Sequence, residues 1–227
     1  MTKKLTLPFF IAIYLLSLAG GFGFAGIRKA NAIAPAPASN RQSSWIMVRV
    51  DDMTSEQPRL VSVWAMFLTF SPGPQIFFKP LYSSEASTNK YPDLEKVFKV
   101  SADRTVSADF IKELDSLITY QSGMVILDDI GFKSFSSWFM PPAIVSNMRP
   151  FVPQTGSRRV LGGETNDYKQ ICRSLENTIR PSLASLPWMN MFPNHIVAYP
   201  SLQGLTSLWE KLVLSDLDAH CEVISVQ

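Results

Sequence analysis

The chain has 227 residues, 46% hydrophobic and 18% charged, so it is long enough for one sizeable domain with a short appendage. The net charge of +2 conceals an asymmetry. Residues 1–43 carry five basic side chains and no acidic one, which leaves sixteen basic and nineteen acidic residues, a net charge of −3, for the rest. The basic character belongs to the N-terminal segment, and we expect no nucleic-acid partner.

The first predicted element is an uncharged stretch of 23 residues, 5–27, preceded by two lysines. Its length suits a membrane-spanning helix of about 20 residues, but residues 30–32 (Ala-Asn-Ala) also fit a signal-peptidase site. We therefore predict a signal-anchor or signal segment over 1–29. Single-pass tethering on the extracytoplasmic face is the leading interpretation, and secretion after cleavage near Ala32 is the alternative. Residues 30–44, rich in Ala, Pro and Ser, form a linker.

Residues 45–227 are predicted to form one α/β domain. Apolar, β-branched runs indicate strands, and apolar residues recurring at i, i+4 and i+7 indicate helices. The expected strands are 45–50, 59–70, 75–82, 123–130, 195–199 and 221–227, and the expected helices are 91–99, 107–118, 131–139, 165–179 and 201–214. Because a Ser-Pro-Gly-Pro turn joins the second and third strands, we predict a mixed sheet with an antiparallel hairpin, covered by helices.

Three finer expectations concern breaks in these elements. Pro80 lacks an amide donor and is predicted to fray or end the third strand. Gly162-Gly163 are interpreted as a turn before a helix that Thr165 caps. Residues 140–159 contain four prolines and are predicted to form a long loop.

The chain has only two cysteines, Cys172 and Cys221. Outside the cytoplasm such a pair is predicted to form a disulfide, closing a loop of about fifty residues and contributing about 3–4 kcal/mol. The alternative is two unrelated buried thiols. A zinc site is not expected, since the chain has no Cys-x-x-Cys and only two histidines.

Acidic pairs follow two of the predicted strands. Asp51 and Asp52 end the first strand, with Arg59 eight positions after Asp51, and Asp128 and Asp129 end the fourth. Carboxylates at a strand end can hold Mg²⁺ together with substrate phosphates. The alternative is an acidic turn that begins a solvated loop. The two pairs meet at one sheet edge only if their strands are adjacent.

Other candidate sites are less specific. The sequence has no Gly-x-Ser-x-Gly elbow, and His195 is interpreted as a loop or core histidine. Arg158 and Arg159 either grip an anionic head group or lie in a solvated loop.

Three motifs in the order of the chain carry a resemblance: "MVRVDD", the long hairpin after it, and "MVILDDIGFKSFSSWF". On them, residues 45–140 resemble the LytR-CpsA-Psr domain of exported, membrane-anchored enzymes that join glycopolymers to bacterial cell walls. Asp51 stands at the acid of the family's "LLLGxD". Asp128, Gly131 and Phe132 match "VVVDxxGF".

The resemblance implies a site in which two aspartates hold Mg²⁺ and arginines clamp the pyrophosphate of a polyprenyl-linked donor. It implies Asp51 as a metal ligand and Arg59 as a catalytic and ligand-binding residue. The further ligand-binding candidates are Arg158, Arg159 and Arg173.

The departures from the family pattern lie at the same site. The place of the second aspartate falls near Val61, or at Ser62 in a shifted register. Leu81 and Tyr82 stand where the family's "IPRDT" has arginine and aspartate.

Three hypotheses for the function are consistent with these motifs. The leading one is a pseudoenzyme: a cell-envelope module with a degenerate phosphotransferase site, binding a polyprenyl lipid or cell-wall glycan in an accessory role. The second is an active Mg²⁺-dependent phosphotransferase that moves a polyprenyl-pyrophosphate-linked glycan to a cell-wall acceptor. The third is a structural or assembly protein without a ligand.

Overall fold

The computed structural model describes residues 42–71, 73–83, 91, 93–118, 121–137, 159–177, 191–213 and 219–224. The predicted signal-anchor at 1–29 and most of the predicted linker lie outside these residues. In the part of the chain that is described, no helix is long and apolar enough to cross a membrane.

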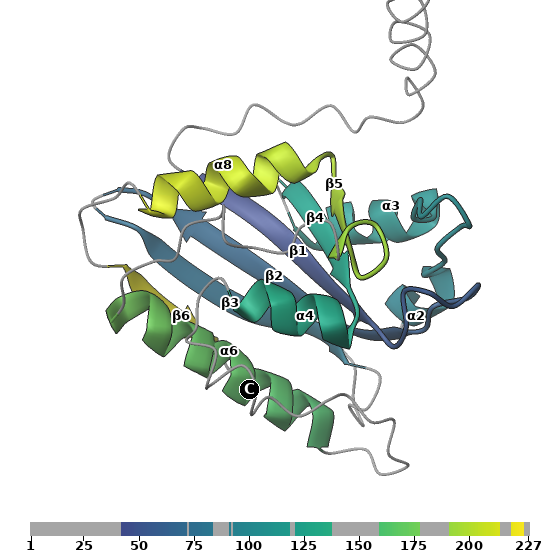
Figure 1. Cartoon of the computed structure of the whole chain (residues 1–227), viewed down its shortest axis with the longest axis horizontal. Coiled ribbons are helices and arrows are strands. Elements are labelled where there is room, and N and C mark those ends of the chain that lie inside the picture. The colour runs from purple at the N-terminus through teal and green to yellow at the C-terminus, as the bar shows by residue number, and fades with distance from the viewer. Residues whose placement is uncertain are drawn as a thin grey trace, which may run out of the picture. The chain divides into compact units, whose positions relative to one another are not determined.

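Six strands form one mixed sheet in the order β5-β4-β1-β2-β3-β6 (Figure 1). The strands are β1 (Gln42–Val50), β2 (Leu60–Thr69), β3 (Gln75–Ser83), β4 (Gln121–Leu127), β5 (Ile196–Tyr199) and β6 (His220–Val223). The pairs β1–β2, β2–β3 and β4–β5 are antiparallel, whereas β1–β4 and β3–β6 are parallel. The predicted mixed sheet with an antiparallel hairpin is confirmed.

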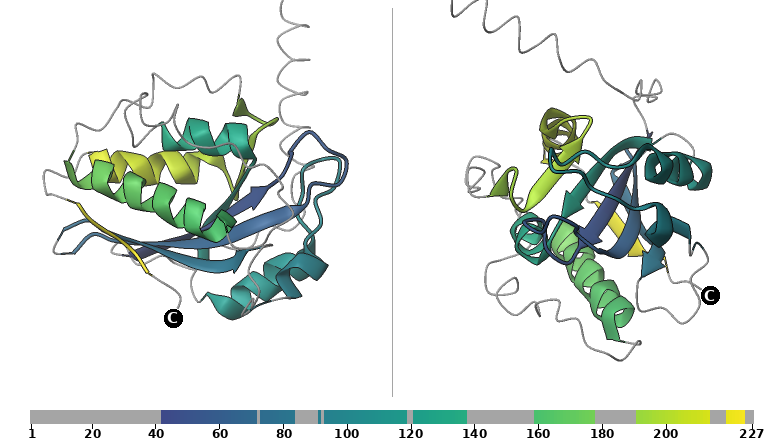
Figure 2. Two further views of the ribbon diagram at one scale, coloured as in Figure 1. Left: turned by 90° about the horizontal axis from the view of Figure 1, so that it is seen from below. Right: turned by 90° about the vertical axis from the view of Figure 1, so that its right-hand side faces the viewer.

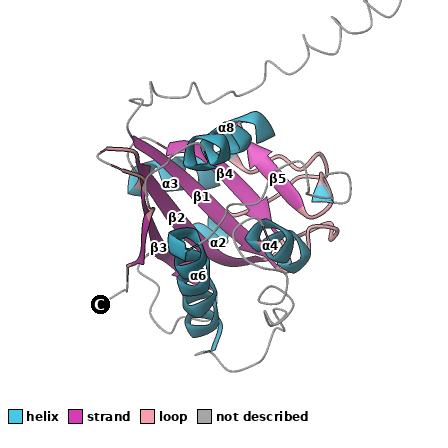
Figure 3. Cartoon of the chain, turned by 60° about the vertical axis from the view of Figure 1, so that its left-hand side comes forward, coloured by secondary structure: helices cyan, strands magenta, loops and turns pink. Residues whose placement is uncertain are grey.

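Helices cover both faces of this sheet, as the edge-on view in Figure 2 shows. They are α2 (Asp93–Val97), α3 (Ala108–Leu117), α4 (Asp129–Ser136), α6 (Arg159–Asn177) and α8 (Leu202–Val213). One core cluster lies between the sheet and α4, α6 and α8, and the other lies between the sheet and α2 and α3. Figure 3 shows α4, α6 and α8 together on one face. The domain is therefore a three-layer α/β/α arrangement.

The central strand β1 is buried on both faces because its side chains alternate between the two cores. Trp45 and Met47 belong to the cluster under α4, α6 and α8, and Ile46 and Val48 belong to the cluster over α2 and α3. The next residue on the Trp45–Met47 face is Arg49, which is buried as well. The alternation thus directs an arginine into an apolar layer.

Helix α6 begins at Arg159, six residues before the predicted cap at Thr165. The predicted turn at Gly162-Gly163 is therefore wrong, since both glycines lie inside the helix. A Cβ at position 163 would meet no atom within 4 Å, so nothing around this glycine prevents the helix from continuing.

The third strand was predicted to fray or end at Pro80; it does not end there, because β3 continues to Ser83, but its pairing is irregular at this point. The register shifts opposite Val63 and Trp64, which leaves one extra residue on β3 beside Pro80. On its other side β3 pairs with β6 over Gln75–Phe78 among the residues that the structure describes. A bulge is a place where a strand tolerates the missing amide of proline.

Two strand boundaries also differ from the prediction. β1 begins at Gln42, inside the predicted linker, and Ser44 N donates to Ser122 Oγ of β4 at 3.2 Å. β4 ends at Leu127, three residues early, because Asp128 caps α4 and its carboxylate accepts from Gly131 N at 2.8 Å.

Candidate functional site

The acidic pairs predicted from the sequence do meet at one edge of the sheet. β1 and β4 are adjacent and parallel, with Arg49 opposite Leu127, so Asp51 and Asp128 follow neighbouring strand ends. β2 begins at this edge directly after Arg59, and β5 begins there directly after His195. In open α/β sheets ligands bind outside the carboxyl ends of strands, so this edge is the candidate site.

Asp51 and Arg59 form an exposed pair that closes the loop between β1 and β2. Arg59 Nε donates to Asp51 Oδ2 at 2.7 Å and Arg59 N donates to Asp51 Oδ1 at 2.8 Å. Asp51 N in turn donates to the carbonyl of Arg59 at 3.1 Å. The guanidinium side chain is 74% exposed. Both oxygens of the predicted metal ligand are thus held by Arg59.

A second arginine at this edge, Arg49, is buried among carboxylates. One terminal nitrogen donates to Glu164 Oε1 at 2.8 Å and the other to Asp129 Oδ1 at 2.5 Å. Its guanidinium carbon lies 4.3 Å from the centroid of the Phe132 ring. The side chains of Arg49 and Glu164 are only 5% and 3% exposed. This is a desolvated ion pair that ties β1 to α4 and α6.

Glu164 receives three hydrogen bonds from the sheet. Besides Arg49, Ser62 Oγ donates to Oε1 at 3.0 Å and Trp64 Nε1 donates to Oε2 at 2.9 Å. The register places these donors together, because Arg49 is opposite Ser62 and Trp64 follows two residues later on the same face. A buried carboxylate with three donors is well satisfied, which its burial requires.

The electrostatics of this cluster show a surplus of negative charge. Burial alone would lower the pKa of Arg49, but the carboxylates of Glu164 and Asp129 outweigh it and raise that pKa. One helical turn beyond Glu164, burial raises the pKa of Asp167 to about 6, and the charges of Glu164 and Asp129 add to this while Arg49 opposes it. The single positive charge of Arg49 therefore interacts with three carboxyl groups, those of Glu164, Asp129 and Asp167.

Asp128 and His195 form a third pair, between β4 and β5. Asp128 Oδ2 lies 2.8 Å from His195 Nδ1, while Oδ1 caps α4. The imidazole is 21% exposed and the carboxylate is buried. Gly131 allows this packing, because a Cβ there would overlap the carbonyl oxygen of His195. The sequence-based interpretation of His195 as a loop or core histidine missed this partner.

The metal that the resemblance implies does not fit this edge as it is arranged. Among the described residues no group of three or more His, Cys, Asp or Glu side chains could hold a metal ion. Both carboxylate oxygens of Asp51 accept hydrogen bonds from Arg59. Asp52 Oδ1 accepts hydrogen bonds from the hydroxyl and the amide of Thr54, and these bonds lower the pKa of Asp52. The edge is a set of internal ion pairs.

The positions at which the sequence departs from the family pattern lie in the core. Val61 and Leu81 are buried apolar side chains. Tyr82 is buried as well, and its hydroxyl donates to Glu95 Oε2 at 2.6 Å. None of these three side chains can supply a carboxylate or guanidinium to the edge.

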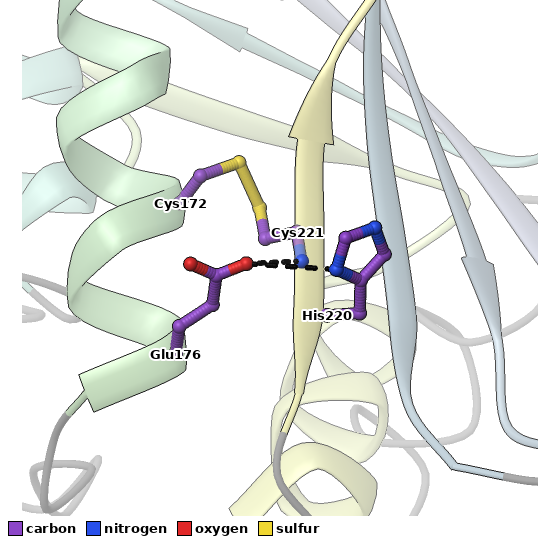
Figure 4. Close-up of a disulfide and its surroundings, with 4 residues drawn as sticks. All are labelled: Cys172, Glu176, His220 and Cys221. Carbon is purple, nitrogen blue, oxygen red and sulfur yellow. Dashed lines mark hydrogen bonds and ion pairs between the residues drawn. A yellow bond between two sulfur atoms is a disulfide. The ribbon is translucent and has the colours of Figure 1, made fainter.

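Of the remaining predicted ligand-binding residues, Arg173 is described together with its side chain. Arg158 lies outside the described residues, and Arg159 begins α6, with its side chain outside the description. Arg173 is exposed on α6, nine residues beyond Glu164, about 13 Å along the helix axis. The predicted disulfide is confirmed, since Cys172 and Cys221 are bonded to each other (Figure 4).

Sequence reasoning gave no role to Arg49 or Glu164, and it missed the partner of His195. Arg49 could have been found because it follows Trp45 and Met47 on the same buried face of β1, where an apolar side chain is expected. Glu164 lies at i−4 from Tyr168, so extending the apolar face of α6 backward by one turn would have found it. His195 offered no local signal, because its partner lies 67 residues away.

Comparisons with known proteins give likenesses in structure but none in sequence. No protein-family model matches the sequence, and no curated protein matches it. Among solved structures, "TagT bound to LIIa-WTA" aligns with a TM-score of 0.48 and 11% identity, over 87% of this chain and 85% of TagT. TagV of B. subtilis aligns with a TM-score of 0.45 and 10% identity, over 83% and 86%. Lin1025 of Listeria innocua aligns with a TM-score of 0.45 and 8% identity, over 82% and 84%.

TagT and TagV are LytR-CpsA-Psr enzymes, the family that the sequence motifs resemble. With TM-scores below 0.5, these likenesses carry no argument about the activity or ligand of this chain. A function for the chain has to rest on its own residues and on the motif resemblance.

Proposed function

We propose that the chain is a LytR-CpsA-Psr-like module of the cell envelope that binds a polyprenyl-linked or glycan ligand without transferring it. The motifs around Asp51, Asp128 and Gly131 support the family. The internal pairing of the charges at the strand edge supports a binding or accessory role.

The observation that carries the proposal is the engagement of Asp51 by Arg59, at 2.7 and 2.8 Å, one bond to each carboxylate oxygen. In a transferase of the implied kind the aspartate would face a metal and the arginine would face a pyrophosphate. Here each neutralises the other. The buried, apolar Val61 and Leu81 stand where further charges would be needed.

The test is a paired binding and turnover assay on the full chain in detergent, with a polyprenyl-pyrophosphate-linked glycan and Mg²⁺. We expect saturable donor binding and no release of polyprenyl phosphate. Mg²⁺-dependent release that Asp51→Ala abolishes would establish an active transferase instead. Absence of both binding and turnover would leave a structural or assembly protein.

We also propose that residues 5–27 tether the domain on the extracytoplasmic face of the membrane. The uncharged stretch and the disulfide support export. A C-terminal alkaline phosphatase fusion should be active and a matching green fluorescent protein fusion dark; the reverse pattern would contradict export. N-terminal sequencing of the mature chain separates an uncleaved anchor from cleavage near Ala32.

A further inference from the structure

Strand β6 (His220–Val223) is an outermost strand of the sheet, at the opposite side from β5. It pairs with β3 in parallel over Gln75–Phe78. His220 N donates to the carbonyl of Pro74 at 2.9 Å, and Ile224 N donates to the carbonyl of Phe78 at 2.8 Å. These bonds all lie on the side of β6 that faces β3.

The other side of β6 is held by α6, as Figure 4 shows. Cys221 is bonded to Cys172, and Cys221 N donates to Glu176 Oε1 at 3.1 Å. His220 Nδ1 lies 3.7 Å from the same oxygen. One helix thus supplies both a covalent bond and an acceptor for an outward-facing amide of the edge strand.

Apolar burial contributes little to the attachment of β6. Within β6 Cys221 is buried, Val223 is partly buried and packs against the core, and His220 and Glu222 are exposed; Ala219, just before the strand, is buried but small. The central strand β1, in contrast, buries seven consecutive residues. Four residues of edge pairing with so little apolar surface do not hold a strand firmly on their own.

Helix α6 makes contacts with the sheet that do not involve β6. Glu164 is bonded to Arg49, Ser62 and Trp64, and Tyr168 packs with its ring centroid 4.4 Å from that of Trp64. Breaking the disulfide therefore leaves α6 on the sheet and removes the strongest fastening of β6.

We propose that the Cys172–Cys221 disulfide is a redox latch whose reduction detaches β6 and opens the outer edge of β3. A dithiol reductant donates two electrons and two protons: the S–S bond breaks, Cys172 and Cys221 become thiols, and the reductant becomes a disulfide. The carbonyls of Pro74 and Phe78 then lose their donors.

Hydrogen exchange of the full chain, read by mass spectrometry with and without dithiothreitol, tests the latch. We expect reduction to speed exchange in residues 219–224 by about 30-fold to 1,000-fold, the range that corresponds to a typical disulfide contribution. β1, β2 and β4 should keep their protection. Cys172→Ser/Cys221→Ser should match the reduced chain without any reductant, and if that variant fails to fold, the reduced wild-type chain still gives the comparison.

Glu176 supplies a matched control. Glu176→Ala should further speed exchange at 219–224 in the reduced chain and change little in the oxidised chain, whereas Glu176→Gln, which keeps an acceptor oxygen, should change little in either. Rapid alkylation of Cys221 after reduction is a second expected readout. Unchanged exchange at 219–224 after reduction would overturn the latch, and so would an equal loss of protection in all strands, because the disulfide would then stabilise the whole fold.

Discussion

Two arginine–carboxylate pairs lie at the same edge of the sheet, with Arg49 and Asp51 two residues apart in sequence, and they differ in burial. Arg49 is enclosed by Glu164, Asp129 and the Phe132 ring, and its side chain is 5% exposed. Arg59 holds Asp51 at similar distances, yet its side chain is 74% exposed. Similar chemical groups thus occupy two very different dielectric environments.

The difference in burial decides how much each pair contributes to the stability of the fold. Removing one partner of a buried pair leaves an uncompensated charge in an apolar layer, which lowers the free energy of unfolding by about 3–5 kcal/mol. Breaking an exposed pair costs about 0–1 kcal/mol, because water replaces the lost partner. The Arg59–Asp51 pair therefore adds little to the stability of the fold, whereas the ion pairs of Arg49 are part of it.

The largest expected effect comes from Arg49→Met. It leaves the buried Glu164 and the partly exposed Asp129 without their cation, and we expect a loss of about 3–5 kcal/mol in the free energy of unfolding. Urea denaturation followed by circular dichroism measures it. Adding Glu164→Gln and Asp129→Asn should recover part of the loss, since the remaining groups are neutral. A loss under about 1 kcal/mol would show that the buried pair behaves as the exposed pair does.

Gly131→Ala tests the Asp128–His195 pair, which is intermediate in burial. The new methyl group overlaps the carbonyl of His195, so α4 must shift, and we expect a loss of about 1–3 kcal/mol. Gly163→Ala is the control. Its Cβ meets nothing within 4 Å inside α6, so it should stabilise the chain by about 0.5–1 kcal/mol. Equal effects of the two substitutions would contradict this assignment.

Asp167→Asn probes the surplus charge around Arg49 and should be stabilising. The pKa of Asp167 is raised from its ordinary 3.8 to about 6, so the folded chain binds this proton more tightly than the unfolded chain does. Its contribution to stability is present below about pH 4 and is lost as pH rises through about 6.

At pH 7 we therefore expect Asp167→Asn to be more stable than wild type by about 1 kcal/mol, a figure reduced for partial solvent exposure. Urea denaturation at pH 4.5 and at pH 7 measures the difference, which should shrink at the lower pH. A gap between variant and wild type that did not depend on pH would contradict the raised pKa.

The smallest expected effect comes from Arg59→Ala. The exposed ion pair is lost, but the amide of residue 59 still donates to Asp51, so the free energy of unfolding should fall by less than about 1 kcal/mol. Arg59→Lys is the matched control, because it keeps the charge without the guanidinium geometry. A loss as large as that of Arg49→Met would remove the distinction between the two pairs.

The local patterns of the sequence predicted most of the elements, because strand alternation and turn composition are local. The hairpin of β2 and β3, the buried face of α6 and the cysteine pair were all predictable from short stretches or residue counts. The start of α6 was missed, because two adjacent glycines resemble a turn when the packing around them is unknown. Because the start of α6 was missed, Glu164 was not recognised as a helix residue, and the partner of Arg49 was missed as well.

An α/β domain with a mixed sheet followed from the sequence alone, since it depends on periodicities of two and about 3.6 residues. The sequence also showed that acidic pairs follow two of the strands, but not that they meet. Only the tertiary structure decided what the acids do. Asp51 pairs with Arg59 across the loop between β1 and β2, whereas Asp128 meets a histidine 67 residues away and Arg49 meets a glutamate 115 residues away. Strand order and helix docking set those partnerships, because they bring distant residues within hydrogen-bonding distance.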